Sequence, residues 1–236
     1  MTTPGPTAAP PRSLRGRIAY RDADGENVGH EHFELVGHEG GHLLRALCRI
    51  DEADLLRDVS LSMDHAWLPE EGYCRILRGG RAEAALWFRV APGGVTIDAS
   101  IRGTPLAQQF IATQQRLPYL GLHPLQGDAL IVEQRGTAAP GQFLPIETVT
   151  NSISPNGDEA TAGAHLFIDA AYIGEETIEV TAGRFAARRY ALRWREDWPP
   201  ADLWVRQEDN LFLLMRWSMI PTWYELTHWT DERPTA

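Results

Sequence analysis

The chain of 236 residues contains no lysine, and all 22 of its basic residues are arginine. A Schiff-base enzyme, a pyridoxal phosphate anchor, a P-loop and a Ser-Lys dyad each need an ammonium group that can lose its proton or sit on a phosphate. Arginine cannot take these roles because its guanidinium stays charged. The absence of lysine therefore excludes all four kinds of site.

Cysteines, cationic clusters and long apolar runs are also scarce. Cys48 and Cys74 are the two cysteines and have no CxxC spacing, which favours small core side chains in a reducing compartment. The net charge of −10 and the pI near 5.3 argue against a nucleic-acid partner. No secretion signal or membrane-spanning run is recognisable, so we expect a cytoplasmic protein without a membrane partner, and a homodimer stays open.

Short alternating runs of apolar and polar residues, broken by glycine, asparagine or aspartate, dominate the chain from residue 15 onward. This period of two is typical of antiparallel strands joined by hairpins. The alanine, leucine and glutamine residues from Leu106 to Leu117 predict one helix, and strands are expected to resume at ALIVEQRG. We predict a disordered tail over residues 1–14 and, over 15–230, a single mainly β domain: a curled antiparallel barrel of about ten strands with one crossing helix.

The stretch VGHEHFELV, residues 28–36, places His30, His32 and Glu34 on one face of a predicted strand. Three interpretations are open: a metal site, a solvated strand face, or the polar lining of a cavity. A metal site needs further ligands, and the chain has no second histidine motif of the kind that follows His-x-His in cupins. We therefore predict neither a metal nor a cofactor.

Two further stretches carry candidate acid–base groups. Asp64 and His65 are adjacent in SMDHAW, where they would point to opposite faces of a strand. His123 and Asp128 flank a turn in YLGLHPLQGDAL, where an apolar setting could hold the pKa of the imidazole near neutrality. The alternative is that His123 and Asp128 only serve the connection between two elements.

Tryptophans gather towards the end of the chain and alternate with arginines in RRYALRW and LMRWSM. Such residues fill a barrel core, but they also suit a pocket for a flat or carboxylated organic molecule. The candidates are catalytic residues His32, His65, His123 and Asp128, and ligand-binding residues His30, Glu34, Asp64, Arg189, Trp194 and Trp217.

Two patterns of strands and turns, AYRDADGENVGHEHFEL and VTAGRFAARRY followed by DLWVRQEDNLFLLMRW, span most of the chain. In both, the chain resembles uncharacterised bacterial proteins with a lipocalin-like curled antiparallel barrel. That resemblance implies a fold and no catalytic residues. Two functions stay open. One is a cofactor-independent lyase, hydratase or isomerase that acts on a small aromatic or lipid-like molecule through histidine. The other is a non-catalytic carrier of a small hydrophobic ligand.

Overall fold

Alternating side chains organise most of the chain into β-strands in the computed structural model, which describes residues 12–159 and 162–233. The first nine strands follow one another without a helix: β1 (Arg12–Arg21), β2 (Asn27–His38), β3 (Gly41–Ile50), β4 (Leu55–Met63), β5 (Pro69–Arg78), β6 (Arg81–Ala91), β7 (Gly94–Ile101), β8 (Thr104–Pro105) and β9 (Gln109–Ala112).

Two short helices interrupt the strands in the second half of the chain. The elements there are β10 (Tyr119–Gly121), α1 (Leu125–Ala129), α2 (Ile131–Arg135), β11 (Leu144–Thr150), β12 (Ala164–Val180), β13 (Gly183–Arg193), β14 (Ala201–Arg206), β15 (Phe212–Arg216) and β16 (Trp223–Glu232). Neither described helix has the length and apolar character that a membrane crossing requires.

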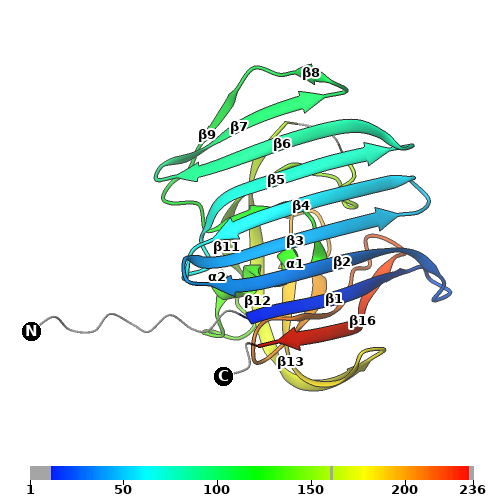
Figure 1. The fold of residues 1–236 in the computed structure, drawn as a ribbon. Helices are drawn as coiled ribbons and strands as arrows, with labels where there is room; N and C mark the ends of the chain where they lie inside the picture. The colour runs from blue at the N-terminus through cyan, green and yellow to red at the C-terminus, as the bar shows by residue number, and fades with distance from the viewer. Residues whose placement is uncertain (1–11, 160–161, 234–236) are drawn as a thin grey trace, which may run out of the picture.

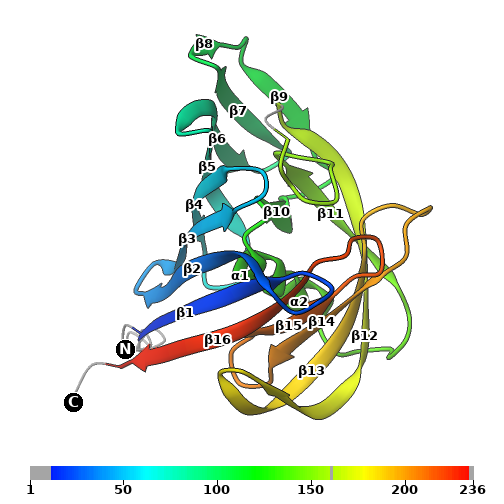
Figure 2. The same cartoon turned by 90° about the vertical axis from the view of Figure 1, so that its right-hand side faces the viewer.

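All of these strands belong to one curved sheet. Its order runs β10 to β16 in sequence and then β1 to β8, because β1 pairs with β16, and β9 pairs with β7. The pairs are antiparallel except for β10 and β11, which are parallel. Figure 2 shows the result: β2–β7 form one wall, β11–β13 form the opposite wall, and β14, β15, β16 and β1 join them. The helices α1 and α2 lie between the walls (Figures 1 and 2).

The two walls meet through side chains where the ladder ends. Gln109 donates a hydrogen bond from Nε2 to the carbonyl of Gly163 at 2.8 Å, which links β9 to the start of β12. The side chains of Leu120 and Leu122 fill the space over Gly72 of β5, where a Cβ atom would collide with them. The sheet is therefore barrel-like, although β8 and β10 at its two edges do not pair with each other.

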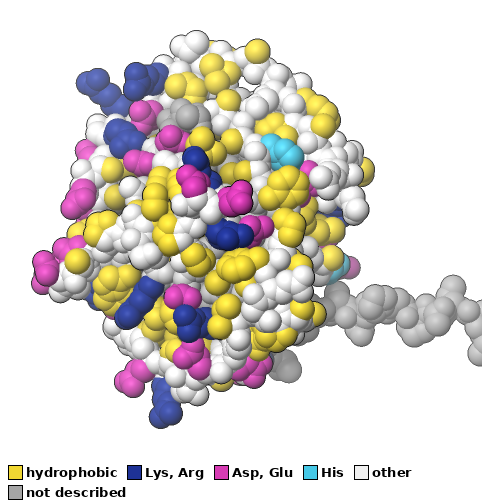
Figure 3. Space-filling view, turned by 180° about the vertical axis from the view of Figure 1, so that it is seen from behind, with side chains coloured by type: hydrophobic (Ala, Val, Ile, Leu, Met, Phe, Trp, Pro, Cys, Tyr) yellow, Lys and Arg dark blue, Asp and Glu magenta, His cyan; other side chains and the backbone are white. Residues whose placement is uncertain are grey.

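The apolar core lies on the concave side of the sheet. Ile18, Leu44, Leu86 and Leu203 are fully buried there. Gly16 of β1 leaves room for the ring of Phe33 on β2, which would clash with a Cβ atom at position 16. On the convex side, acidic and arginine side chains of neighbouring strands pair, as Arg193 does with Asp169 at 2.7 Å. Both kinds of side chain are interspersed with hydrophobic ones on the face shown in Figure 3.

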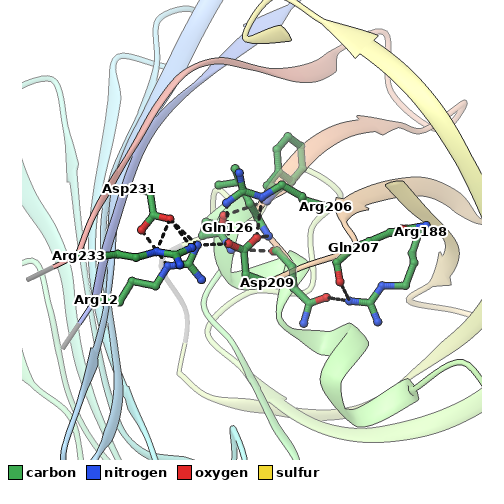
Figure 4. Close-up of polar contacts among 11 residues, drawn as sticks. Arg12, Gln126, Arg188, Arg206, Gln207, Asp209, Asp231 and Arg233 are labelled. Carbon is green, nitrogen blue, oxygen red and sulfur yellow. Dashed lines mark hydrogen bonds and ion pairs between the residues drawn. The ribbon is translucent and has the colours of Figure 1, made fainter. Parts of the chain in front are cut away.

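An ionic network ties the loop after β14 to the ends of β1 and β16 (Figure 4). Asp209 accepts hydrogen bonds from Arg206 at 2.8 and 2.6 Å and from Arg12 at 2.5 Å, and Arg12 also contacts Asp231 at 2.8 Å. Gln126 of α1 contacts the end of the same loop. It accepts a hydrogen bond from the amide of Phe212 at 3.0 Å and donates one to the carbonyl of Asn210 at 3.1 Å. The network therefore fixes the position of α1 as well as the strand ends.

The mainly β, barrel-like fold predicted from the sequence is confirmed, but its details differ. The described residues form sixteen strands instead of about ten, and several of these strands, such as β8 and β10, are only two or three residues long. No helix covers Leu106–Leu117: residues 109–112 pair with β7 instead, and that pairing overrides the helix propensity of alanine, leucine and glutamine. The helices fall at 125–129, where a turn was expected, and at 131–135, where a strand was expected.

The predicted N-terminal tail is also too long. Residues 12–14 belong to β1 and pair with β2, and residues 13 and 14 also pair with β16, so the strand begins before residue 15. The rest of the predicted tail, residues 1–11, lies outside the described residues.

Candidate functional site

A cavity of about 340 Å³ lies inside the curve of the sheet, beside α1. Buried residues of β1, β4 and β10 and of α1 form its base, while the exposed residues Glu52, Ile153 and Arg195 lie on its open side. This volume is near the lower end of the range of about 300–1,000 Å³ that is usual for ligand pockets. The cavity is large enough for one small organic molecule.

Three tryptophans form an aromatic wall of the cavity. The ring of Trp217, which follows β15, lies 5.0 Å from that of Trp194 and 5.5 Å from that of Trp198 between centroids. Trp217 donates a hydrogen bond from Nε1 to the carbonyl of Pro199 at 2.6 Å, which fixes its ring. Because the indole donor is satisfied by backbone, the wall presents apolar ring surface to the cavity.

Asp128 of α1 places a carboxyl group at the base of the cavity. Its Oδ1 accepts a hydrogen bond from the hydroxyl of Tyr119 at 2.9 Å, while the side chain remains partly accessible inside the cavity. Burial deep in the protein raises the pKa of Asp128 to about 7, although the Tyr119 hydroxyl and the charge of Arg57 act in the opposite direction. The carboxyl can therefore gain or lose its proton near neutral pH.

Arg57 of β4 contributes a buried cation beside the same base. Its guanidinium donates to the carbonyls of His123 at 3.0 Å and Asn156 at 3.3 Å, and also to that of Gly157. The residue is only 2% exposed, and its Nε has no hydrogen-bond partner among the described residues. Most of this guanidinium is thus used to hold two loop segments against the sheet.

Glu31 of β2 connects the sheet to α1. Its fully buried carboxylate accepts hydrogen bonds from the backbone amides of Leu125 at 2.6 Å and Gln126 at 3.0 Å, the first residues of the helix. Burial raises the pKa of Glu31 to about 7, and these two hydrogen bonds oppose that rise. By capping the free amides at the start of α1, Glu31 sets the position of Asp128 one turn further on.

His123 lines the cavity but is poorly suited to accept a proton. Its backbone has a φ of 65°, and its Nε2 lies 3.1 Å from the carbonyl oxygen of Ser152 and 3.0 Å from Oγ1 of Thr150. Burial, with a smaller contribution from the charge of Arg57, lowers the pKa of His123 to about 3. The imidazole is therefore neutral at neutral pH and fixes the loop by hydrogen bonds.

Four of the residues predicted from the sequence line the cavity: His123, Asp128, Trp194 and Trp217. Arg189 does not, because it forms an ion pair with Asp202 of the neighbouring strand at 2.9 Å.

His30, His32 and Glu34 lie on the outer face of β2, away from the cavity. The rings of His30 and His32 are 5.0 Å apart, and partial burial lowers the pKa of each. Glu34 accepts hydrogen bonds from Ser13 at 2.8 Å and Arg15 at 2.9 Å. The face that VGHEHFELV turns inward instead carries Glu31.

Asp64 and His65 lie in the turn after β4, not within a strand as predicted. The Asp64 carboxylate accepts hydrogen bonds from the amides of Ala66 at 2.8 Å and Leu68 at 3.0 Å and pairs with Arg116 at 2.7 Å. The Nε2 of His65 lies 2.9 Å from the carbonyl oxygen of Glu39. Neither residue lines the cavity, and the turn accounts for the contacts of both.

Arg57 and Glu31 were missed by the sequence interpretation, although a signal for each was present. In LLRDVSLSM, Arg57 shares the inward face with Leu55, Val59, Leu61 and Met63, so it is the charged residue on an otherwise apolar face. Glu31 is likewise the charged residue on the otherwise apolar inward face of β2. A charged residue in phase with the buried positions of a strand indicates a buried polar site.

Comparison with known proteins finds a likeness among solved structures. No protein-family model and no curated protein matches the chain. A crystal structure of a beta-barrel-like protein of the domain of unknown function DUF1849, from Brucella abortus, aligns with 95% of this chain and 98% of its own at a TM-score of 0.57. The sequence identity is 10%, so this likeness concerns the fold alone.

Proposed function

We propose that the protein is a non-catalytic carrier that binds a small, mainly apolar molecule in the cavity beside α1. The observation that carries the proposal is the cavity of about 340 Å³, walled by Trp194, Trp198 and Trp217. Transfer of apolar surface from water to such a wall favours binding.

A carrier is favoured over a histidine enzyme because the candidate histidines do not converge. His32 lies on the outer face of β2 and His65 lies in a surface turn, so neither can exchange a proton with a molecule in the cavity. His123 does line the cavity, but its lowered pKa leaves it neutral and weakly basic.

One observation favours a second candidate, a cofactor-independent lyase, hydratase or isomerase. Asp128 has a pKa of about 7 and faces the cavity beside the hydroxyl of Tyr119. A carboxyl group with a pKa near the working pH can act as a general acid or base. In this alternative, Asp128 replaces histidine as the group that moves the proton.

Binding can be tested with N-phenyl-1-naphthylamine, a neutral probe whose fluorescence rises in apolar surroundings. Leu166 of β12 faces the cavity, and the next residue, Phe167, is 41% exposed on the other face. Leu166→Trp should fill the cavity and weaken probe binding about tenfold or more, whereas the matched Phe167→Trp should change it less than about twofold. Equal binding by both variants, with circular dichroism showing that both are folded, would refute a cavity ligand.

Carrier and enzyme can be separated by the fate of a bound molecule. A compound that is extracted from the purified protein and incubated with fresh protein should be recovered unchanged if the protein is a carrier. Conversion that Asp128→Asn abolishes would establish the enzyme instead.

A further inference from the structure

We infer that the ligand carries a protonated amine, which lies against Asp128 while its apolar or aromatic body contacts the tryptophan wall. This inference rests on the proposed binding function and names the ligand class for that cavity.

The first argument concerns which charged group a ligand can reach. Arg57 is 2% exposed and its guanidinium nitrogens donate to three backbone carbonyls, so little of its cation is open to the cavity. Asp128 is partly accessible, and the Tyr119 hydroxyl is its one side-chain partner among the described residues. The second carboxylate oxygen, Oδ2, has open lone pairs and therefore suits a ligand that donates a hydrogen bond.

The second argument concerns the balance of charge around the base of the cavity. Two carboxyl groups, Asp128 and Glu31, act on each other there, and Arg57 is the cation beside them. When both carboxyl groups are ionised, one negative charge is left without a counter-ion. A ligand ammonium supplies that counter-ion, whereas a ligand carboxylate would add a third anion.

The third argument concerns the aromatic surface next to Asp128. Tyr119 and Tyr224 both line the cavity, and the ring of Tyr20 packs edge-on against Tyr224 at 5.0 Å between centroids. Burial raises the pKa of the Tyr224 hydroxyl, and the charges of Arg57 and Asp128 act on it in opposite directions. Aromatic faces around a carboxylate attract an organic cation through the ring quadrupole.

Three probes with the same naphthyl body test this inference by isothermal titration calorimetry at about pH 8: 2-(1-naphthyl)ethylamine, 2-(1-naphthyl)ethanol and 1-naphthylacetate. A hydrogen bond to a charged group strengthens binding by a factor of about ten to a hundred. The amine should therefore bind at least about tenfold tighter than the alcohol, and the acid should bind most weakly. Asp128→Asn should remove the advantage of the amine over the alcohol.

Asp58→Asn is the matched control, because Asp58 lies on the outer face of β4 and pairs with Arg75 at 3.0 Å. It should keep the preference for the amine. Binding of the alcohol or the acid as tight as that of the amine would overturn the inference while leaving a binding cavity in place. Failure of all three probes to bind would overturn the proposed function as well.

The wild-type protein supplies a second readout that needs no variant. Asp128, which faces Tyr119, Tyr224 and Arg57 and is coupled to Glu31, must be ionised to pair with the ammonium. Because burial holds its pKa at about 7, the ratio of amine to alcohol affinity should rise about tenfold between pH 6 and pH 8. His123 stays neutral over this range and does not contribute. A ratio that falls or stays constant would overturn the inference.

Discussion

Replacing Asp128 by asparagine should stabilise the protein above pH 7 and have little effect near pH 4. Burial raises the pKa of this carboxyl to about 7 in the folded protein, against about 4 for an ordinary aspartate. The folded protein thus binds the proton more tightly than the unfolded chain, so stability falls as the pH rises from about 4 to about 7. Asparagine removes that cost and still offers an oxygen to the Tyr119 hydroxyl.

A difference of about three pH units between folded and unfolded pKa corresponds to at most about 4 kcal/mol. Asp128 is partly accessible in the cavity, which weakens the effect of burial, so we expect a gain in the free energy of unfolding of about 2 kcal/mol. Urea denaturation at about pH 4 and about pH 8 measures it, with Asp58→Asn as the control for a surface carboxylate. A variant that is less stable than the wild type at pH 8, or whose gain is the same at both pH values, would refute the reasoning.

Three further substitutions test other parts of the account. Trp217→Ala should weaken binding of N-phenyl-1-naphthylamine and lower the free energy of unfolding by about 3 kcal/mol or more, because Trp217 is only 7% exposed. The control Trp87→Ala, at a residue that is 39% exposed, should change both quantities little. His32→Gln should leave probe binding within about twofold. A tenfold loss would indicate that the outer face of β2 takes part in binding, which would contradict the account. Arg206→Met should lower the free energy of unfolding by about 3 kcal/mol in urea titrations, because it leaves Asp209 short of a buried partner, and an unchanged midpoint would contradict the role of that network.

The longer strands were predictable because one face of each is buried. Their sequences therefore alternate between apolar and polar residues. β4 shows this plainly: its burial alternates at every residue from Leu55 to Met63. The number and pairing of strands were not predictable in the same way. Residues 109–112 lie in a stretch whose composition favours a helix. Only their pairing with β7, which is a long-range contact, makes them the strand β9.

The helices at 125–135 were not predictable from local sequence either, because a distant residue sets where the first one begins. The amides that begin α1 are capped by the carboxylate of Glu31, which is 94 residues away in the chain from Leu125. No local capping residue precedes the helix, since Pro124 makes no side-chain hydrogen bond there. A helix that is capped by a distant strand leaves no local start signal in the sequence.

The candidate site was predicted in part. His123 and Asp128, which the sequence singled out in an apolar setting, both line the cavity. Trp194 and Trp217 also line it, and for them a pocket was one of two interpretations left open by the sequence. The histidines of VGHEHFELV were misleading because they were chosen for their acid–base chemistry, although the alternation of the strand places them on the outer face. Gly29, Phe33 and Leu35 mark the inward face of that stretch, and Glu31 shares it.

The most direct test of the central claim, that a small molecule binds in the cavity beside α1, is a ¹H–¹⁵N NMR titration with 2-(1-naphthyl)ethanol that follows the assigned tryptophan indole signals. The Nε1–H signals of Trp194, Trp198 and Trp217 should shift together and saturate at one equivalent, because all three line the cavity, while the signal of Trp87 on the outer face of β6 should not move. A saturable shift of Trp87 with no change at Trp217 would place the ligand on the outer surface and contradict the account, and unchanged spectra would contradict it too.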